Sequence, residues 1–432
     1  MAPESPAPAL DPLAEPVDRV GRGFIAVLAL TNLGIWTAFF TPIQFLLPLQ
    51  VEAIAPASKE SSLGVVVAVG AFVSLVASPL AGAFSDRTSA RLGRRRTWVL
   101  WPTLAAVAVL ALMGGLTTIG GLVLGWALGQ LTLNASYAAV TAMLPDQAPV
   151  AQRGTVGAVV GAAQPLGVIV GSLIATLVPG DNTAADGQRA RYLVVAVVVL
   201  MTAVLFVARM RDPRLERDRI PAFHLGTFSR AFWVSPRAHP DFAWVFLTRF
   251  LVILGTAFVT SYLLYFTRDV LGRSPDEAGD TVAAILQFYI VALLVSALVA
   301  GPVSDRVGRV KPFVIGASLV CAGAILVLSF ARTQEAATVA AVIMGAGFGA
   351  YTAVDLALIS RVLPSAGDRA RDLGIINIAN ALPQVLAPLV ASVWITALRP
   401  SGYDVAYQSL YVAAAVVTVL GAVLVVKVRG VP

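Results

Sequence analysis

The stretch Gly82-Ala-Phe-Ser-Asp86-Arg87-Thr-Ser-Ala-Arg91-Leu-Gly93-Arg94-Arg95-Arg96 joins two long apolar runs. A second stretch, Gly301-Pro-Val-Ser-Asp305-Arg306-Val-Gly308-Arg309-Val-Lys311, follows another apolar run 219 residues later. Both read Gly-x-x-Ser-Asp-Arg, followed by Gly-Arg and further basic residues. The recurrence indicates that the second part of the chain repeats the first.

Two further matches occur at almost the same offset. Arg153 stands twelve residues before Pro165, and the same spacing to a proline recurs after Arg371, 218 residues further on. The tetrapeptide that begins at Tyr137, Tyr-Ala-Ala-Val, is matched by Tyr-Thr-Ala-Val from Tyr351. Three matches at nearly one offset predict an internal duplication, which is a feature of many membrane transporters.

The composition indicates a chain that lies mostly in lipid. Of its 432 residues, 58% are hydrophobic and 13% are charged, whereas about 25% of the residues of a soluble domain are charged. A membrane span must bond its backbone polar groups internally, so the long apolar runs are expected to be helices. Twelve such runs occur, at about 24–51, 61–84, 98–118, 120–144, 155–178, 191–208, 242–267, 278–302, 312–330, 336–360, 373–397 and 405–426.

Lysine and arginine predict how these helices are oriented. With both termini in the cytoplasm, 23 of the 31 basic residues fall in cytoplasmic segments, 7 fall in outer loops, and Arg249 lies within a span. Because cytoplasmic loops of membrane proteins carry the excess of Lys and Arg, this orientation is favoured. An odd number of spans would break the alternation. We therefore expect a multi-pass protein of the cell membrane with both termini inside.

The same pattern divides the chain into two blocks of six spans. The expected parts are a disordered cytoplasmic tail (1–22), an N-terminal six-helix bundle (23–208), a cytoplasmic central loop (209–241), a C-terminal six-helix bundle (242–427) and a short cytoplasmic tail (428–432). The fold class is therefore an all-α membrane protein of twelve transmembrane helices in two pseudo-symmetric bundles.

These motifs resemble the major facilitator superfamily, and the resemblance covers about residues 20–430. The loop after the second span is similar to the most specific signature of that superfamily. The extended form SDRTSARLGRRR, together with GIINIANALPQVLAP in the eleventh span, looks more narrowly like the sugar-transporting branch. That branch includes the glycoside–pentoside–hexuronide cation symporters and the sucrose-type carriers. The resemblance implies the major facilitator fold.

The resemblance also implies gating residues. In the superfamily, the aspartate after the second span lies against the N-terminus of the eleventh span, where a helix end favours an anion. Here that contact would join Asp86 to the region of Arg371 and Asp372, and Asp305 would face the start of span five. The alternative is a solvated basic loop. The expected gating residues are Gly82, Asp86, Arg87, Gly93, Arg94, Gly301, Asp305 and Arg306.

Polar and aromatic residues within the spans are candidates for a substrate site, because such residues are costly in lipid and usually line a cavity. Amides and rings suit a neutral polyhydroxylated ligand, and Asn377, Asn380 and Gln384 form one helical stripe. Bonding between helices is the alternative role. The candidates are Asn32, Trp36, Gln44, Gln164, Tyr262, Tyr265, Gln287, Tyr289, Asn377, Asn380 and Gln384.

Two charged residues fall inside spans, Arg249 and Asp355. Counting along the spans places both at nearly the same depth from the cytoplasmic side. A buried carboxylate tends to take up a proton, while a nearby arginine favours the charged form. We expect Asp355 and Arg249 to form a proton-coupling site, with a static ion pair as the alternative.

Several functions are disfavoured by what the sequence lacks. The melibiose-type sodium symporters have acids in spans two and four, and this chain has none there. It also has no arginine in span four. It also lacks a Gly-Lys-[Ser/Thr] phosphate loop. We expect no catalytic residues, no metal ligands, no cofactor and no nucleic-acid partner. The partners expected are a small-molecule substrate, a proton or other cation and the lipid bilayer, with a functional monomer.

The expected function is secondary active transport of a small organic solute, such as a sugar or glycoside, by alternating access with proton coupling. Export of drugs or secondary metabolites is the alternative within the same fold. An intramembrane enzyme is the alternative from another class, but it would need paired intramembrane acids or a metal cluster. The sequence leaves open the substrate, the direction of transport and the coupling ion.

Overall fold

The computed structural model describes residues 16–216, 237, 239–307, 309–362 and 369–429, with side chains described except at 305, 356, 357, 359–362 and 369–377. Eleven helices in this part are long and apolar enough to cross a membrane. The twelfth crossing is α5 (Ile119–Gln147), which is 29 residues long but carries the polar residues Gln130 and Asn134. The expected all-α class of twelve transmembrane helices is confirmed.

The first six crossings, here called the N-half, follow the expected spans to within a few residues. They comprise α1 (Arg22–Thr41), a π-helical turn (Pro42–Leu46), α2 (Leu47–Ile54), α3 (Lys59–Ser85), α4 (Arg94–Met113), α5, α6 (Val150–Gly161), α7 (Ala163–Leu177) and α8 (Arg189–Arg209). The glycine before α4, Gly93, has a φ of 98°, a left-handed conformation that favours glycine. The left-handed backbone at this position therefore gives a local structural reason for a glycine before the basic run.

The last six crossings, here called the C-half, repeat this order. They comprise α10 (Pro240–Ser261), α11 (Leu263–Asp269), α12 (Pro275–Val307), α13 (Lys311–Ser329), α14 (Gln334–Val362), α15 (Arg369–Leu398) and α16 (Tyr403–Leu424). Proline begins α10 and α12, where its missing N–H group costs no helical hydrogen bond. The exact bounds proposed for the two bundles stay a prediction, and residues 217–236 of the central loop lie outside the described part.

Three of the expected continuous spans are interrupted. The first bends through the π-helical turn at Pro42, because proline lacks a donor and its ring clashes with the preceding turn. The fifth divides at Ala162, three residues before Pro165, which cannot donate to the helix. The seventh divides at Tyr262, whose φ of −121° and ψ of 18° leave the helical region.

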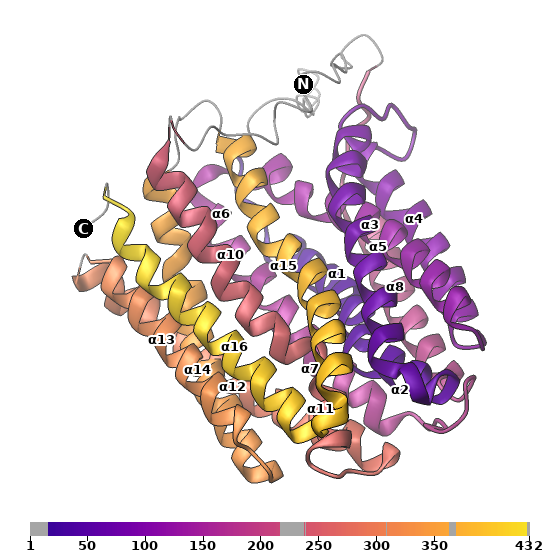
Figure 1. Cartoon of the computed structure of the whole chain (residues 1–432). Helices are drawn as coiled ribbons and strands as arrows, with labels where there is room; N and C mark the ends of the chain where they lie inside the picture. The colour runs from indigo at the N-terminus through magenta and orange to yellow at the C-terminus, as the bar shows by residue number, and fades with distance from the viewer. Residues whose placement is uncertain (1–15, 217–236, 238, 308, 363–368, 430–432) are drawn as a thin grey trace, which may run out of the picture.

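The two halves meet through symmetry-related helices. The second crossing of each half packs against the fifth crossing of the other, so α3 contacts α15 and α12 contacts α7. Figure 1 shows α15 standing beside the helices of the N-half. The duplication read from the sequence therefore corresponds to a pseudo-twofold arrangement around the boundary between the halves.

Both ends of the helical part lie on one side, since twelve crossings return the chain to its starting side. Next to α1, the backbone N–H of Val20 donates to Gln152 Oε1 at 2.8 Å. After α16, the backbone N–H of Arg429 donates to Asp241 Oδ1 at 2.8 Å. We call this the terminal side and the opposite one the far side.

Candidate transport site and gates

A charged pair lies within the C-half. Arg249 of α10 forms an ion pair through Nη1 with Asp355 Oδ2 of α14. The Arg249 Nε–H donates to Asn380 Oδ1 of α15 at 2.9 Å. The sequence placed Arg249 and Asp355 at one depth, and the structure brings them into contact while adding Asn380 as a second partner. Three helices therefore meet at one mostly buried cation.

Tyr351 belongs to the same cluster. It lies four residues before Asp355 on α14, so the two residues share one face of that helix. Its side chain is buried, and its ring stacks on Phe348 with centroids 5.9 Å apart. The Tyr351 hydroxyl has no hydrogen-bond partner among the residues that the structure describes. Sequence reasoning used Tyr351 only as a mark of the duplication and did not place it at the site.

The corresponding helices of the N-half carry aromatic rings instead of charge. Trp36 of α1 stacks on Phe40 at 5.4 Å and meets Tyr137 of α5 edge-on at 5.2 Å. Phe39 adds a third neighbour of Trp36 at 5.6 Å. Trp36 and Tyr137 are half-buried. The sequence candidate Trp36 is thus part of an aromatic cluster rather than an isolated ring.

The predicted amides lie in different surroundings. Asn32 is buried and donates to Leu28 O within its own helix at 2.8 Å. Gln287 of α12 lies 3.4 Å from Ser172 Oγ of α7, so it bridges the two halves. Gln164 and Gln384 are exposed, whereas Gln44 is half-buried in the π-helical turn. The side chain of Asn377 lies outside the described residues, so the expected stripe is seen only at Asn380 and Gln384.

Polar residues of α5 form a cluster that sequence reasoning missed. Asn134 Nδ2 donates to Gln130 Oε1 at 2.8 Å, and Ser74 Oγ of α3 donates to Asn134 Oδ1 at 3.1 Å. Both amides are buried. They were visible as the only amides in span four, and their bonds join α5 to α3 within the N-half.

A network of ion pairs closes the far side between the halves. Lys59 Nζ of α3 lies 2.6 Å from Asp269 Oδ1 of α11 and 3.3 Å from Glu52 Oε1 of α2. Arg268 Nη2 of α11 lies 3.0 Å from the same Glu52 oxygen. Lys59 Nζ also sits 4.8 Å from the centre of the Tyr265 ring. We call these contacts, with those of Glu60 described next, the far-side lock.

Glu60 holds the other end of the lock. The Tyr403 hydroxyl of α16 donates to Glu60 Oε1 at 3.1 Å, and Arg399 Nη1 lies 4.0 Å from Glu60 Oε2. The Tyr262 hydroxyl lies 2.9 Å from the backbone oxygen of Glu60 and 3.0 Å from that of Pro388. Glu60 is therefore held by partners from three segments of the C-half.

The two tyrosines expected at the substrate, Tyr262 and Tyr265, both belong to this lock. They are fully buried, and the Tyr265 hydroxyl donates to the Pro48 backbone oxygen across the boundary at 2.9 Å. Tyr289, a further candidate, lines a small cavity inside the C-half that is described below. In this conformation the three rings are occupied in contacts between helices.

On the terminal side, the gate residues of the N-half pair with one another. Asp86 Oδ1 accepts from Arg95 Nη2 at 2.6 Å, and its side chain is 48% exposed. Arg95 Nε and Arg94 Nη2 also reach Asp146 Oδ2, at 2.7 Å and 3.0 Å. The expected partner of Asp86, the start of α15, has no described side chains, and neither has Asp305. The latch between halves therefore stays a prediction.

The loop behind this gate is fixed by Asp212. Its carboxylate accepts from the backbone N–H groups of Arg95 and Arg96 at 2.6 Å and 2.8 Å. Burial raises the pKa of Asp212, while these two hydrogen bonds act to lower it. The contacts anchor the first turn of α4 to the segment that follows α8.

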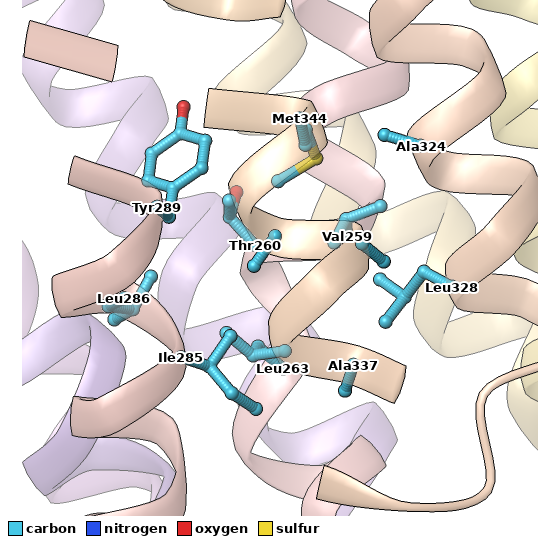
Figure 2. A pocket seen from close by; sticks show the side chains of 12 residues that line it. Val259, Thr260, Leu263, Ile285, Leu286, Tyr289, Ala324, Leu328, Ala337 and Met344 are labelled. Carbon is cyan, nitrogen blue, oxygen red and sulfur yellow. The ribbon is translucent and has the colours of Figure 1, made fainter. Parts of the chain in front are cut away.

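Two cavities lie away from the charged pair. One is apolar, with a volume of about 20 Å³, and lies among α10, α12, α13 and α14 next to Thr260 and Tyr289 (Figure 2). That volume admits about one water-sized sphere, so the cavity is too small for an organic solute. The other, about 300 Å³, lies on the far side between α7 and α12 and is lined in part by Arg191, Asp276 and Asp280.

Comparison with known proteins identifies this architecture. The family described as MFS/sugar transport protein matches residues 59–426. The chain belongs to this family. It therefore is a member of the major facilitator superfamily, as the duplicated loops suggested.

Relatives of this MFS chain span most of its length. Multidrug resistance protein MdtG of Enterobacter lignolyticus is 25% identical over 320 residues, which cover 72% of each chain. Ectoine/proline transporter ProP of Corynebacterium glutamicum is 25% identical over 377 residues, covering 80% of this chain and 72% of ProP. A solved bacterial homologue of the human lysosomal transporter Spinster, in an inward-facing and occupied conformation, is 12% identical with a TM-score of 0.73 and covers 94% of this chain and 96% of its own. The MFS fold and the class of secondary transporters of small solutes follow.

Proposed function

We propose that this protein carries a small organic solute across the cell membrane by alternating access, with a proton as the coupling ion. The observation that carries the proposal is the far-side lock, in which charged residues of the two halves meet across a boundary between duplicated bundles. A carrier of this kind needs one closed end at a time. The contacts of Lys59 with Glu52 and Asp269 supply a closure that can be broken without unfolding either half.

The far side is proposed to face outward. The excess of Lys and Arg lies on the terminal side, which is then cytoplasmic. In that orientation the lock closes the outer end, and the exposed Asp86 belongs to the inner gate. The described conformation corresponds to a carrier whose outer end is shut.

Asp355 is proposed to carry the coupling proton. It is buried within α14 (Gln334–Val362) and forms an ion pair with Arg249 of α10. A carboxylate in such a place is held charged by its partner and takes up a proton when that partner moves. The alternative is a static ion pair that only joins α10 to α14.

The substrate remains a choice between two solute classes. The family description favours a sugar or glycoside, while the name of the relative MdtG favours export of drugs. A thermal-shift screen of the purified protein against sugars, glycosides, amino acids and antibiotics chooses between them, since a bound ligand stabilises the folded state by mass action. The screen also identifies a solute for transport assays.

The test of coupling uses Asp355→Asn in proteoliposomes. The variant should retain counterflow exchange of the solute but lose accumulation driven by a pH gradient. Asp186→Asn, an exposed acid on the far side, is the matched control and should accumulate solute like the unmodified protein. Accumulation by Asp355→Asn would remove Asp355 as the coupling residue, and absence of counterflow in the unmodified protein would contradict transport itself.

A further inference from the structure

Arg249 and its neighbours carry N–H and O–H groups that have no acceptor among the described residues. A guanidinium has five N–H donors and no acceptor, and the described bonds of Arg249 use Nη1 and Nε. Asn380 accepts from Arg249 through Oδ1, which leaves its Nδ2 amide group to donate. The Tyr351 hydroxyl has no partner among the described residues. The Arg249 Nη2 group, the Asn380 amide and the Tyr351 hydroxyl are therefore donors for which the described residues supply no acceptor.

Arg249 is the more exposed member of the ion pair. The Arg249 side chain is 14% exposed, whereas that of Asp355 is 3% exposed. Asn380 is half-buried. A ligand that approaches this cluster therefore meets the guanidinium and the amide first, and the carboxylate lies behind them.

From this arrangement we propose that Arg249, Asn380 and Tyr351 form the subsite for a carboxylate, so that the solute is an organic anion. The inference rests on the proposed transport function. An arginine fork matches the two oxygens of a carboxylate, and charge-assisted hydrogen bonds of this kind are about twice as strong as neutral ones. A neutral sugar hydroxyl would use the same donors without gaining from the charge.

An anion at this subsite competes with Asp355 for the guanidinium. When the solute carboxylate binds, Asp355 is left buried with a weaker partner and takes up one proton. One negative charge and one proton enter together, so the site gains no net charge. By linkage, protonation of Asp355 strengthens anion binding by the same factor.

Among the residues whose side chains are described, Arg249 is the one ion-pair partner of Asp355. On the helices packed against α14, the titratable groups near the cluster are Arg249 of α10, Cys321 of α13 and Tyr289 of α12. Cys321 and Tyr289 are neutral at physiological pH. The proton balance of the described cluster is therefore set by Asp355 and Arg249 alone.

The test uses matched pairs of acid and neutral ligand, benzoate with benzamide and galacturonate with galactose, on the purified full chain. At least one acid should bind at least tenfold more tightly than its neutral partner. The affinity for that acid should rise as pH falls. Calorimetry in two buffers should show that about one proton is taken up when the acid binds. Equal affinity within both pairs, or no binding by either acid, would overturn the subsite.

Variants assign the effect to the named residues. Arg249→Gln should abolish the preference for the acid, and Arg249→Lys should restore it only in part because the fork is lost. Tyr351→Phe, which removes a hydroxyl that has no partner among the described residues, should weaken acid binding about tenfold. Asp355→Asn should bind the acid without proton uptake, and Arg332→Gln, on the far-side loop, is the control that should change nothing.

Failure here is distinguishable from failure of the transport proposal. If counterflow of galactose or of an antibiotic proceeds while both acids fail to bind, transport stands and the carboxylate subsite is wrong. If an acid binds but Arg249→Gln binds it equally well, the anion lies elsewhere and the subsite is again wrong.

Discussion

Lys59 of α3 and Asp269 of α11 lie 2.6 Å apart across the boundary between the two halves, although 210 residues separate them in the chain. Their side chains are only 7% and 9% exposed. Each comes from the end of a helix, and neither half alone would hold the pair. In the conformation described here, this contact therefore joins the two halves on the far side.

Lys59→Met should open the far side. The substitution leaves Asp269 and Glu52 buried without their shared cation, and breaking a buried pair costs about 3–5 kcal/mol. Since about 1.4 kcal/mol is a tenfold change in an equilibrium, the open population should rise by at least tenfold. The measurement is labelling of Gln287→Cys by an impermeant maleimide from the far side, in a Cys321→Ala background.

Lys59→Met with Asp269→Leu is the matched comparison. Removing both members of the close pair leaves fewer uncompensated charges, so labelling should fall back toward that of the parent protein. If Lys59→Met alone labels no faster than the parent, the ion pair does not hold the far side shut.

Closure of the far side should depend on pH through Asp269, which lies beyond the candidate span Pro240–Ser261. Burial raises the pKa of Asp269, and the nearby Lys59 lowers it by less. A carboxyl whose pKa is raised in the closed state favours closure fully below its ordinary pKa, and this contribution is lost as pH rises through the raised value. Labelling of Gln287→Cys from the far side should therefore slow as pH falls through that window.

Asp269→Asn supplies the control, because an amide does not titrate. The pH dependence of labelling in that window should flatten in the variant. A pH dependence that persists unchanged would assign it to another group of the lock.

Asp86→Asn should favour the conformation described here. Asp86 is half exposed, so its pair with Arg95 stabilises this state by no more than about 1 kcal/mol. In the opposite state the expected contact with the start of α15 is worth about 0.3–2 kcal/mol. The variant should raise terminal-side labelling of Gln384→Cys several-fold. Glu216→Gln, another exposed acid on the terminal side, should have no effect, and equal labelling of the two variants would contradict the latch.

The orientation is tested by labelling intact cells. Asp181→Cys lies on the far side and Glu216→Cys on the terminal side, both exposed. In a Cys321→Ala background, an impermeant reagent should label the former and spare the latter. Labelling of Glu216→Cys from outside would reverse the assignment of both ends.

The fold was readable from the sequence because its signals are local or repeated. Apolar length predicted the twelve crossings, and the recurrence of Gly82–Arg87 at Gly301–Arg306 predicted the duplication. Breaks at prolines could have been anticipated at Pro42 and near Pro165. The break at Tyr262 has no such sign, since no glycine or proline stands there, and the residue is held by contacts with the other half.

The sequence predicted the charged pair but did not predict the far-side lock. Depth counting predicted that Arg249 and Asp355 would be level, and they are in contact. Lys59, Arg268 and Arg399 are among the seven basic residues that the sequence analysis counted in outer loops, because each stands at the end of an apolar run. Their burial depends on how the two halves close, which leaves no periodicity in the chain.

The far-side lock holds three carboxylates, Glu52, Glu60 and Asp269, against Lys59, Arg268 and Arg399. Removing water from charged groups becomes less costly as temperature rises, because their hydration has a strongly negative entropy. The ion pairs of the far-side lock should consequently become more stable as temperature rises and less stable as it falls. The temperature at which the protein is prepared will bias which of its two ends is found shut.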